Sequence, residues 1–297
     1  MRGVRGIATP GVSKRGIARP GIARRGVTRL VETLDLYRAF AGASLRARMQ
    51  YRASFLLGNF ALILTNIVQF IYIWAVLYRF GTIHGWNFGQ VTLLYALSML
   101  SGGVFTIFFR QFVLLQQLVQ SGRLDQYYTR PAGLFFQVLT SGLDLDGLGN
   151  IIAGLACLYF AAVTAPIQFT AARSAFLVLF VLSGAAIKAG IAVALASTSF
   201  WIVESEPLMT MVMQHLAICG WQFPISVYGR FIQYLLTFLF PYAFCNFFPA
   251  QAILGKNDFT FFHPVFAYLS PFVGVAVFCI GYVVWRVGIL RYQSTGS

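Results

Sequence analysis

Long apolar runs are the feature that most constrains the fold of this chain. Residues 55–78 contain no charged residue, and five further segments are nearly as apolar. A helix of about 20 apolar residues crosses the ~30 Å hydrocarbon core of a bilayer. Charged residues make up only 10% of the chain, against about 25% in soluble domains, so a soluble core is excluded. The sequence therefore predicts an all-α integral membrane protein.

The apolar segments predict six transmembrane helices within a domain that covers residues 53–297. We expect these helices at about residues 55–78, 91–109, 148–167, 175–198, 208–224 and 265–287. A further apolar stretch at about 225–250 contains Pro241, Asn246 and Pro249, which interrupt a membrane helix. We expect an outer re-entrant helical segment there, because broken helices persist at membrane depth only against protein or a water-filled cavity.

The distribution of Lys and Arg favours six spans over seven. Six spans place 17 of the 22 basic residues on one side of the membrane and four on the other. Basic residues accumulate on the cytoplasmic side, whereas seven spans would move Arg286 and Arg291 outside. We therefore expect a multi-pass protein of the cell inner (cytoplasmic) membrane with both termini in the cytoplasm.

The first 52 residues differ from the apolar remainder. Residues 1–30 form a basic low-complexity tail with eight basic residues, no acid and a ten-residue repeat, and their Gly and Pro content predicts disorder. Binding to anionic lipid headgroups and a dispensable extension both fit this tail, whereas nucleic-acid binding is not expected. Residues 31–52 combine apolar positions at helical spacing with interleaved arginines, which predicts an interfacial amphipathic helix.

Polar side chains inside the predicted spans are candidates for a translocation path. Ionisable and amide groups at membrane depth are costly unless they face other helices or water. For Lys188, in the fourth span, a structural pairing and a place on the path fit equally well. For His215, a helix–helix contact fits better than a proton relay. The candidate path residues are Thr65, Asn66, Gln69, Lys188, Gln214 and His215.

A polar loop at residues 118–140 separates the second and third spans. It contains a break at Gly122, a polar run from Arg123 to Gln126 and the pair Arg130-Pro131. Glycine and proline interrupt helices, so a short helical element is expected between these two breaks. If a partner protein moves this chain, the loop is the surface on which it would act.

No catalytic or metal-binding pattern accompanies these features. The sequence contains no GxxxxGK[ST] phosphate loop, so it has no ATPase site of that kind. His84, His215 and His263 are scattered, and Asp144 and Asp146 lack the other ligands of a calcium loop. We therefore expect that this chain is not an enzyme, that it binds no cofactor and that it has no metal site. If it performs work in the membrane, the energy must come from a partner protein or an ion gradient; otherwise it uses none.

Five short motifs follow one another along the chain. They are QYRASFLL at Gln50 to Leu57, SGRLDQYYTRP in the polar loop, SFWIVES at Ser199 to Ser205, LLTFLFPYAFCNFFPA at Leu235 to Ala250, and the C-terminal RYQSTGS. This order resembles the ABC-2 family of ATP-binding-cassette permeases, in particular a six-span subfamily encoded beside a second, similar permease and a separate ATPase. The resemblance covers about residues 35–297.

The resemblance implies a type V exporter architecture. Two six-helix permeases, identical or different, pair side by side above two ATPase subunits, which bind ATP and Mg. The polar loop then carries a coupling helix at about Gln116–Gln126 that docks on the ATPase, and the re-entrant segment caps the outer end of the path. The coupling residues implied in this way are Leu118, Arg123, Leu124, Asp125, Gln126 and Tyr127.

The function expected is that of a permease subunit in an ATP-driven exporter. Its substrate would be an amphipathic or lipid-like molecule or a drug. Membrane lipids would surround the protein itself. The alternative is a self-sufficient secondary transporter or channel. That alternative needs ionisable residues along a path and an inverted repeat, for which Lys188 and His215 alone give thin support.

Overall fold

The computed structural model describes residue 42 and residues 52–129, 133–165, 170–202, 204–256 and 262–292. Every regular element in these ranges is a helix, apart from an isolated β-bridge between Ile83 and Trp86. The all-α fold expected from the sequence is confirmed. The predicted tail at 1–30, and the predicted interfacial helix at 31–52 except its residues 42 and 52, lie outside the described residues.

Five helices in the described ranges are long and apolar enough to cross a membrane. They overlap five of the six spans expected from the hydropathy pattern, because uninterrupted apolar runs of this length satisfy all their backbone hydrogen bonds only as helices. The five are α2 (Arg52–Phe80), α3 (Phe88–Val113), α7 (Gly147–Thr164), α8 (Ala171–Ser197) and α13 (Ser270–Arg291).

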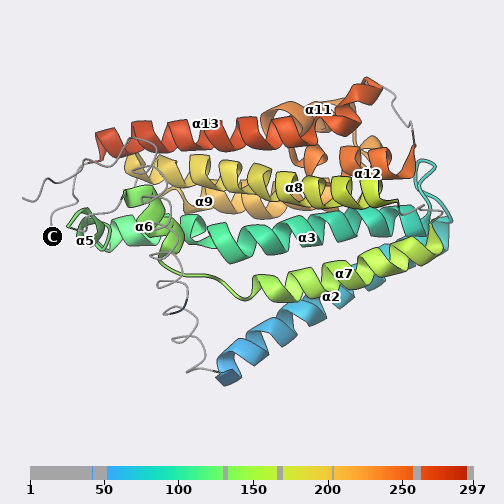
Figure 1. Cartoon of the computed structure of the whole chain (residues 1–297), viewed down its shortest axis with the longest axis horizontal. Helices are drawn as coiled ribbons and strands as arrows, with labels where there is room; N and C mark the ends of the chain where they lie inside the picture. The colour runs from blue at the N-terminus through green and yellow to red at the C-terminus, as the bar shows by residue number, and fades with distance from the viewer. Residues whose placement is uncertain are drawn as a thin grey trace, which may run out of the picture.

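These helices lie side by side in the order α13, α8, α3, α7, α2 across the molecule (Figure 1). α8 packs on both α13 and α3, whereas α2 packs mainly on α7 and so lies at the edge of the bundle. The outer face of α2 exposes large apolar side chains such as Leu57, Phe60 and Val68. A lipid bilayer would cover such a face without cost, which fits the confirmed membrane fold.

Glycines allow the central helices to approach closely. A Cβ added at Gly190 in α8 would lie 2.6 Å from the carbonyl carbon of Val277 in α13, and Gly281 in α13 faces the backbone of Gly190. A Cβ at Gly103 in α3 would lie 2.8 Å from the carbonyl oxygen of Gly147 in α7. Small residues at such crossings let helix backbones pack in van der Waals contact, which drives association between helices in lipid.

The fifth expected span, at 208–224, is shorter in the structure than the other five. It comprises α9 (Glu206–Thr210), the π-helical turn η2 (Met211–Leu216) and α10 (Ala217–Trp221). At 1.5 Å per residue this continuous helical run reaches only about 24 Å, less than the ~30 Å hydrocarbon core. That this run crosses the membrane as a sixth span therefore stays a prediction.

The segment expected to re-enter the membrane at 225–250 is a series of short helices. The helical structure is interrupted at Pro241 and Asn246. The Asn246 side chain compensates for the lost helical hydrogen bonds. Its Nδ2 donates to the Gly220 oxygen over 2.9 Å, and its Oδ1 accepts from the Phe247 amide over 2.7 Å. The helices are η3 (Ile225–Val227), α11 (Arg230–Tyr234), η4 (Leu235–Leu239), η5 (Tyr242–Cys245) and α12 (Phe247–Leu254), and η6 (Pro264–Tyr268) precedes α13.

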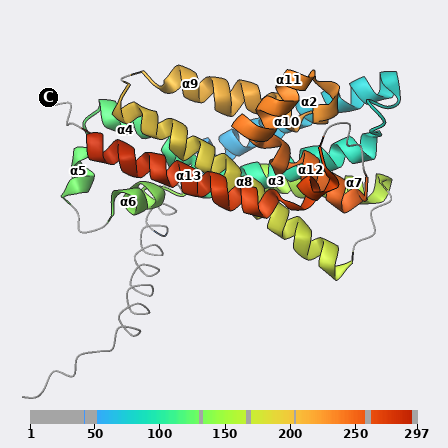
Figure 2. The same ribbon diagram turned by 90° about the horizontal axis from the view of Figure 1, so that it is seen from above.

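The two ends of the bundle differ. α4 (Leu115–Gln120), α5 (Asp125–Tyr128) and α6 (Leu134–Thr140) lie at one end, together with the C-terminal end of α13 (Figures 1 and 2). α12 and the turn between α2 and α3 lie toward the opposite end. We call these the α4–α6 end and the α12 end. A short 3₁₀ turn, η1 (Thr198–Phe200), closes α8 at the α4–α6 end.

Replacing Gly190 with Val tests the close crossing of α8 and α13. The added side chain meets the α13 backbone, so we expect a loss of about 1–3 kcal/mol in stability. The readout is the thermal unfolding midpoint of the purified protein in detergent. Gly58→Ala in α2 is the matched control, because a Cβ there meets nothing within 4 Å. Equal midpoints for the two variants would contradict the packing described here.

Candidate functional site

A cavity of about 360 Å³ lies inside the helix bundle. α2 and α3 form two of its walls, and the helical run from Glu206 to Trp221 forms a third. Asn150 of α7, Lys188 of α8, and Tyr242 and Cys245 of η5 complete it. Elements far apart in the sequence therefore meet around one space.

Lys188 is the charged residue that lines this cavity. Its Nζ donates to the Ser98 carbonyl oxygen over 2.8 Å and to the Ser101 hydroxyl over 3.0 Å, both on α3. A Cβ added at the neighbouring Gly102 would lie 3.3 Å from Nζ, so the glycine makes room for the ammonium group. Both bonds go to neutral groups, and no Asp or Glu is among the residues that line the cavity.

Amide side chains of α2 and α7 meet next to this lysine. Asn66 Nδ2 donates to Asn150 Oδ1 over 3.0 Å, and the Tyr95 hydroxyl donates to the Asn66 carbonyl oxygen over 3.3 Å. Thr65 lines the cavity, and its hydroxyl donates to the Ala61 carbonyl oxygen over 2.9 Å. These bonds satisfy polar groups that lipid would leave unpaired.

The structure gathers four of the six candidate path residues around the cavity and separates two. Thr65, Asn66, Lys188 and Gln214 line it. Gln69 instead accepts a hydrogen bond from Gln222. A role on a translocation path stays a prediction for all six residues.

His215 lies in a second cavity of about 760 Å³ at the α4–α6 end, beside Glu204 and Glu206. Its Nδ1 is 3.3 Å from the Thr210 carbonyl oxygen, so its contact lies within its own helical run. His215 therefore lines a different cavity from its sequence neighbour Gln214, a difference that only the tertiary structure reveals.

Sequence reasoning did not single out Ser98, Ser101 and Asn150 as residues of the site. Ser98 and Ser101 are spaced i, i+3 on α3 and so share a helix face, a pattern that could have signalled a polar contact in the second span. Asn150 sits in the first turn of α7, where helix capping is the more usual role of asparagine.

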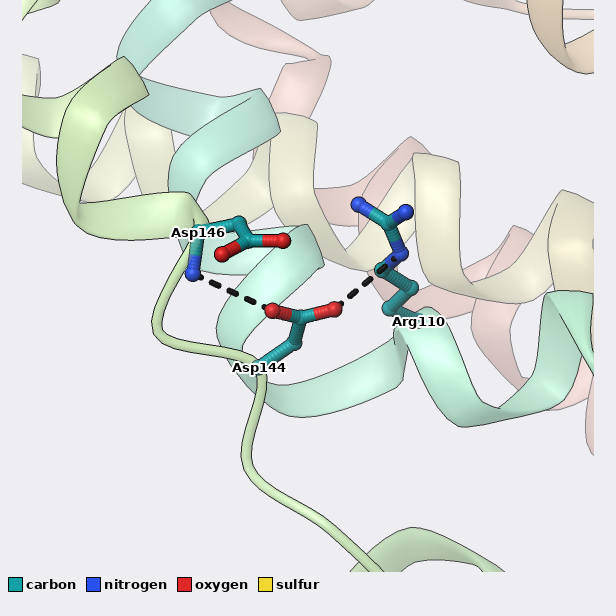
Figure 3. A network of polar contacts seen from close by, with 3 residues as sticks. All are labelled: Arg110, Asp144 and Asp146. Atoms are coloured by element: carbon teal, nitrogen blue, oxygen red, sulfur yellow. Dashed lines mark hydrogen bonds and ion pairs between the residues drawn. The ribbon is translucent and has the colours of Figure 1, made fainter. Parts of the chain in front are cut away.

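An ion pair fixes the loop before α7 to α3. Arg110 Nε lies 3.1 Å from Asp144 Oδ2, and Asp144 Oδ1 accepts from the Asp146 amide over 3.1 Å (Figure 3). Asp144 is buried, whereas Arg110 is 45% exposed. Asp146 is the N-cap residue of α7, but its side chain makes no capping hydrogen bond. The described residues contain no cluster of three metal-ligating side chains.

The implied coupling residues at the α4–α6 end fall into two groups. Arg123 and Gln126 are exposed, and Leu118 and Tyr127 are half-buried. Leu124, however, is fully buried, because a left-handed turn at Gly122 (φ +67°) folds the chain back. The Leu124 amide then donates to the Leu118 oxygen over 3.2 Å. Leu124 thus shapes this surface rather than contributing to it.

Asp125, the remaining implied coupling residue, is held by the C-terminal end of α13. The Tyr292 hydroxyl donates to Asp125 Oδ1 over 3.1 Å, and the Tyr292 ring stacks on Tyr128 with centroids 6.1 Å apart. Burial, together with this hydrogen bond, raises the pKa of Tyr292 to about 12. The hydroxyl therefore stays protonated at neutral pH and remains a donor to the carboxylate.

An aromatic cluster lies beneath α4–α6. Trp285 of α13 makes edge contacts with Phe112 of α3, Phe135 of α6 and Phe200 of η1, at centroid distances of 5.4, 5.6 and 5.3 Å. Phe200 also contacts Tyr292 at 5.7 Å. Such pairs add about 0.5–1.5 kcal/mol each beyond area burial. The α4–α6 end is thereby packed as one unit with α3, α8 and α13.

Replacing Tyr292 with Phe removes the bond to Asp125 and keeps the stacked ring. We expect a local cost of about 1 kcal/mol, and therefore about fivefold faster backbone hydrogen exchange at residues 123–129 with α8 unchanged. Tyr159→Phe is the matched control, because that α7 tyrosine is 75% exposed. Unchanged exchange at 123–129 in the Tyr292 variant would show that this bond does not hold α5.

Comparison with protein-family models matches residues 63–296 to the model described as ABC-2 family transporter protein. This match covers most of the chain and includes the α4–α6 end and every residue that lines the cavity of Lys188 except Leu62. No curated protein and no solved structure matches the chain.

Proposed function

Because this chain belongs to the ABC-2 family of transporter proteins, we propose that it is the permease subunit of an ATP-binding-cassette exporter. It is a multi-pass membrane protein of a family that serves membrane transport. The observation that carries the proposal is the family match over residues 63–296, within which the sequence contains no phosphate loop. A separate ATPase subunit, which binds ATP and Mg, would then supply the energy.

The proposed location is the cell inner membrane, and the proposed orientation places the α4–α6 end in the cytoplasm. Arg110, Arg123 and Arg291 belong to this end, as expected for a cytoplasmic surface. The opposite end carries Arg79, Arg173, Arg230 and Lys256, so the excess of basic residues on the proposed cytoplasmic side comes mainly from the sequence of residues 1–52. Both termini would then lie in the cytoplasm.

The proposed ATPase contact is the exposed surface formed by the turn at Gly122 and by α5. It is centred on Arg123 and Gln126. Leu118 and Tyr127 form its half-buried edge. Asp125 holds this surface in shape through its hydrogen bond with Tyr292, and Leu124 does so through its burial among apolar side chains that include Phe112 and Trp285. A second ABC-2 permease, identical or paralogous, would bring an equivalent contact to a second ATPase subunit.

The proposed coupling transmits a displacement of the α4–α6 end to the helices around the cavity through the packing of the aromatic cluster. Trp285 joins α13 to Phe112 of α3, and α3 carries Ser98 and Ser101 beside Lys188. Packed interfaces respond to a bound partner by switching between discrete arrangements rather than by bending. ATP-dependent approach of two ATPases would in this way alternate the opening of the cavity, which takes an amphipathic, lipid-like or drug substrate.

A self-sufficient secondary transporter or channel is the less favoured function. Such a protein needs a series of ionisable groups across the membrane. Lys188 and His215 lie in different cavities, and no acid lines the cavity of Lys188. Within the described residues, the structure therefore forms no series of neighbouring ionisable side chains across the membrane.

Replacing both Arg123 and Gln126 with Ala tests the proposed contact. Both side chains are exposed, so the fold should persist while the tagged chain retains about tenfold less ATPase on purification. Membrane insertion should be unchanged. Arg79→Ala, at the exposed outer end of α2, is the control and should retain ATPase fully. Undiminished ATPase recovery with the double variant would exclude this surface as the contact.

A further inference from the structure

We infer that the cavity around Lys188 binds the anionic headgroup of an amphiphile whose acyl chain lies along the apolar wall. This inference rests on the proposed transport function and names the chemical class of its substrate. It depends on three properties of the cavity: a basic side chain with no acidic partner among the lining residues, a set of polar groups around it, and an opening toward the membrane.

The charge is the first property. Lys188 Nζ has three N–H donors, and its two hydrogen bonds in the described structure go to the Ser98 carbonyl and the Ser101 hydroxyl. Neither group carries a negative charge, and the lining residues include no carboxylate. A cation at membrane depth is costly, so an anion that enters this cavity gains both a charge partner and a charge-assisted hydrogen bond.

The second property is the polar surroundings of the ammonium group. Thr106 and Gln214 line the same cavity, and the Asn66–Asn150 pair closes one side of it. Hydroxyl and amide groups donate to the remaining oxygens of a phosphate or carboxylate. Gly102 leaves space for Nζ to stay at the surface of the cavity. A single charge with a few neutral donors suits one headgroup rather than a chain of charged sugars.

The third property is the shape and opening of the cavity. Leu62, Met99, Phe105 and Met213 give it apolar walls, and its volume of about 360 Å³ is at the lower end of small-molecule sites. Thr65 of α2 and Gln214 of the 206–221 helix line the cavity and are exposed, so it opens between these two elements. The outer face of α2 beside this opening is apolar, as a lipid-facing surface would be.

The competing explanation is that Lys188 only clasps α8 to α3. Both explanations use the bonds to Ser98 and Ser101, but only the binding site predicts a preference for negative charge in a ligand. The test therefore compares lysophosphatidylglycerol, which is anionic, with lysophosphatidylcholine of the same acyl chain, which is zwitterionic. Binding to the purified full chain is measured by native mass spectrometry.

We expect the wild-type chain to bind lysophosphatidylglycerol about tenfold more tightly than lysophosphatidylcholine. Both lipids present a phosphate to Lys188, but the quaternary ammonium of the choline headgroup offsets that negative charge and is repelled by the lysine. Lys188→Gln should abolish this preference, because it weakens lysophosphatidylglycerol binding more than lysophosphatidylcholine binding, and Lys188→Arg should retain it. Lys256→Gln removes a lysine at the α12 end and should also retain it. No preference in the wild type, or a preference that survives Lys188→Gln, would overturn the inference.

Two further measurements use the wild-type chain, and so remain decisive if Lys188→Gln does not fold. A diazirine in the acyl chain of lysophosphatidylglycerol should label α3 and residues 206–221, whereas label confined to the outer face of α2 would overturn the inference. Millimolar inorganic phosphate should not compete, and displacement by it would point to a free anion instead of a headgroup. Neither measurement involves the ATPase, so failure here is distinguishable from failure of the proposed exporter function.

Discussion

The absence of water from the hydrocarbon core is the constraint on which the rest of this structure depends. Each backbone amide at that depth needs a partner within the protein, which makes long apolar runs helical and forces compensation wherever a helix breaks. Asn246 provides that compensation in the interrupted segment at 225–250, through Gly220 and Phe247. Lys188 follows the same rule at the side-chain level, by bonding to Ser98 and Ser101.

The two halves of the bundle use different packing for different tasks. Glycine crossings bring the backbones of α8 and α13 together, and those of α3 and α7. At the α4–α6 end, large aromatic rings around Trp285, among them Phe112 of α3, fill the space instead. The cavity lies against α3, and α3 is common to both regions. A displacement of the α4–α6 end therefore has a continuous packed route to Lys188, which is the physical basis of the proposed coupling.

Hydropathy was sufficient to predict the all-α membrane fold, because length and apolarity alone decide whether a segment can cross a bilayer. It could not predict the π-helical turn inside the run that ends at Trp221, since that turn depends on packing. The sequence identified Asn66 and Gln69 as candidates for the same path, but only the tertiary structure shows that they meet different partners. The burial of Leu124 likewise follows from the turn at Gly122, which leaves no hydropathy signal.

The central claim is that a separate ATPase meets this chain at its α4–α6 end. Photocrosslinking in living cells, with p-benzoylphenylalanine in place of Gln126, tests it most directly. Phe80, exposed at the far end of α2, is the matched position. The account predicts an adduct between position 126 and a protein that contains a phosphate loop, and none from position 80. No such adduct from position 126, or equal adducts from both positions, would contradict it.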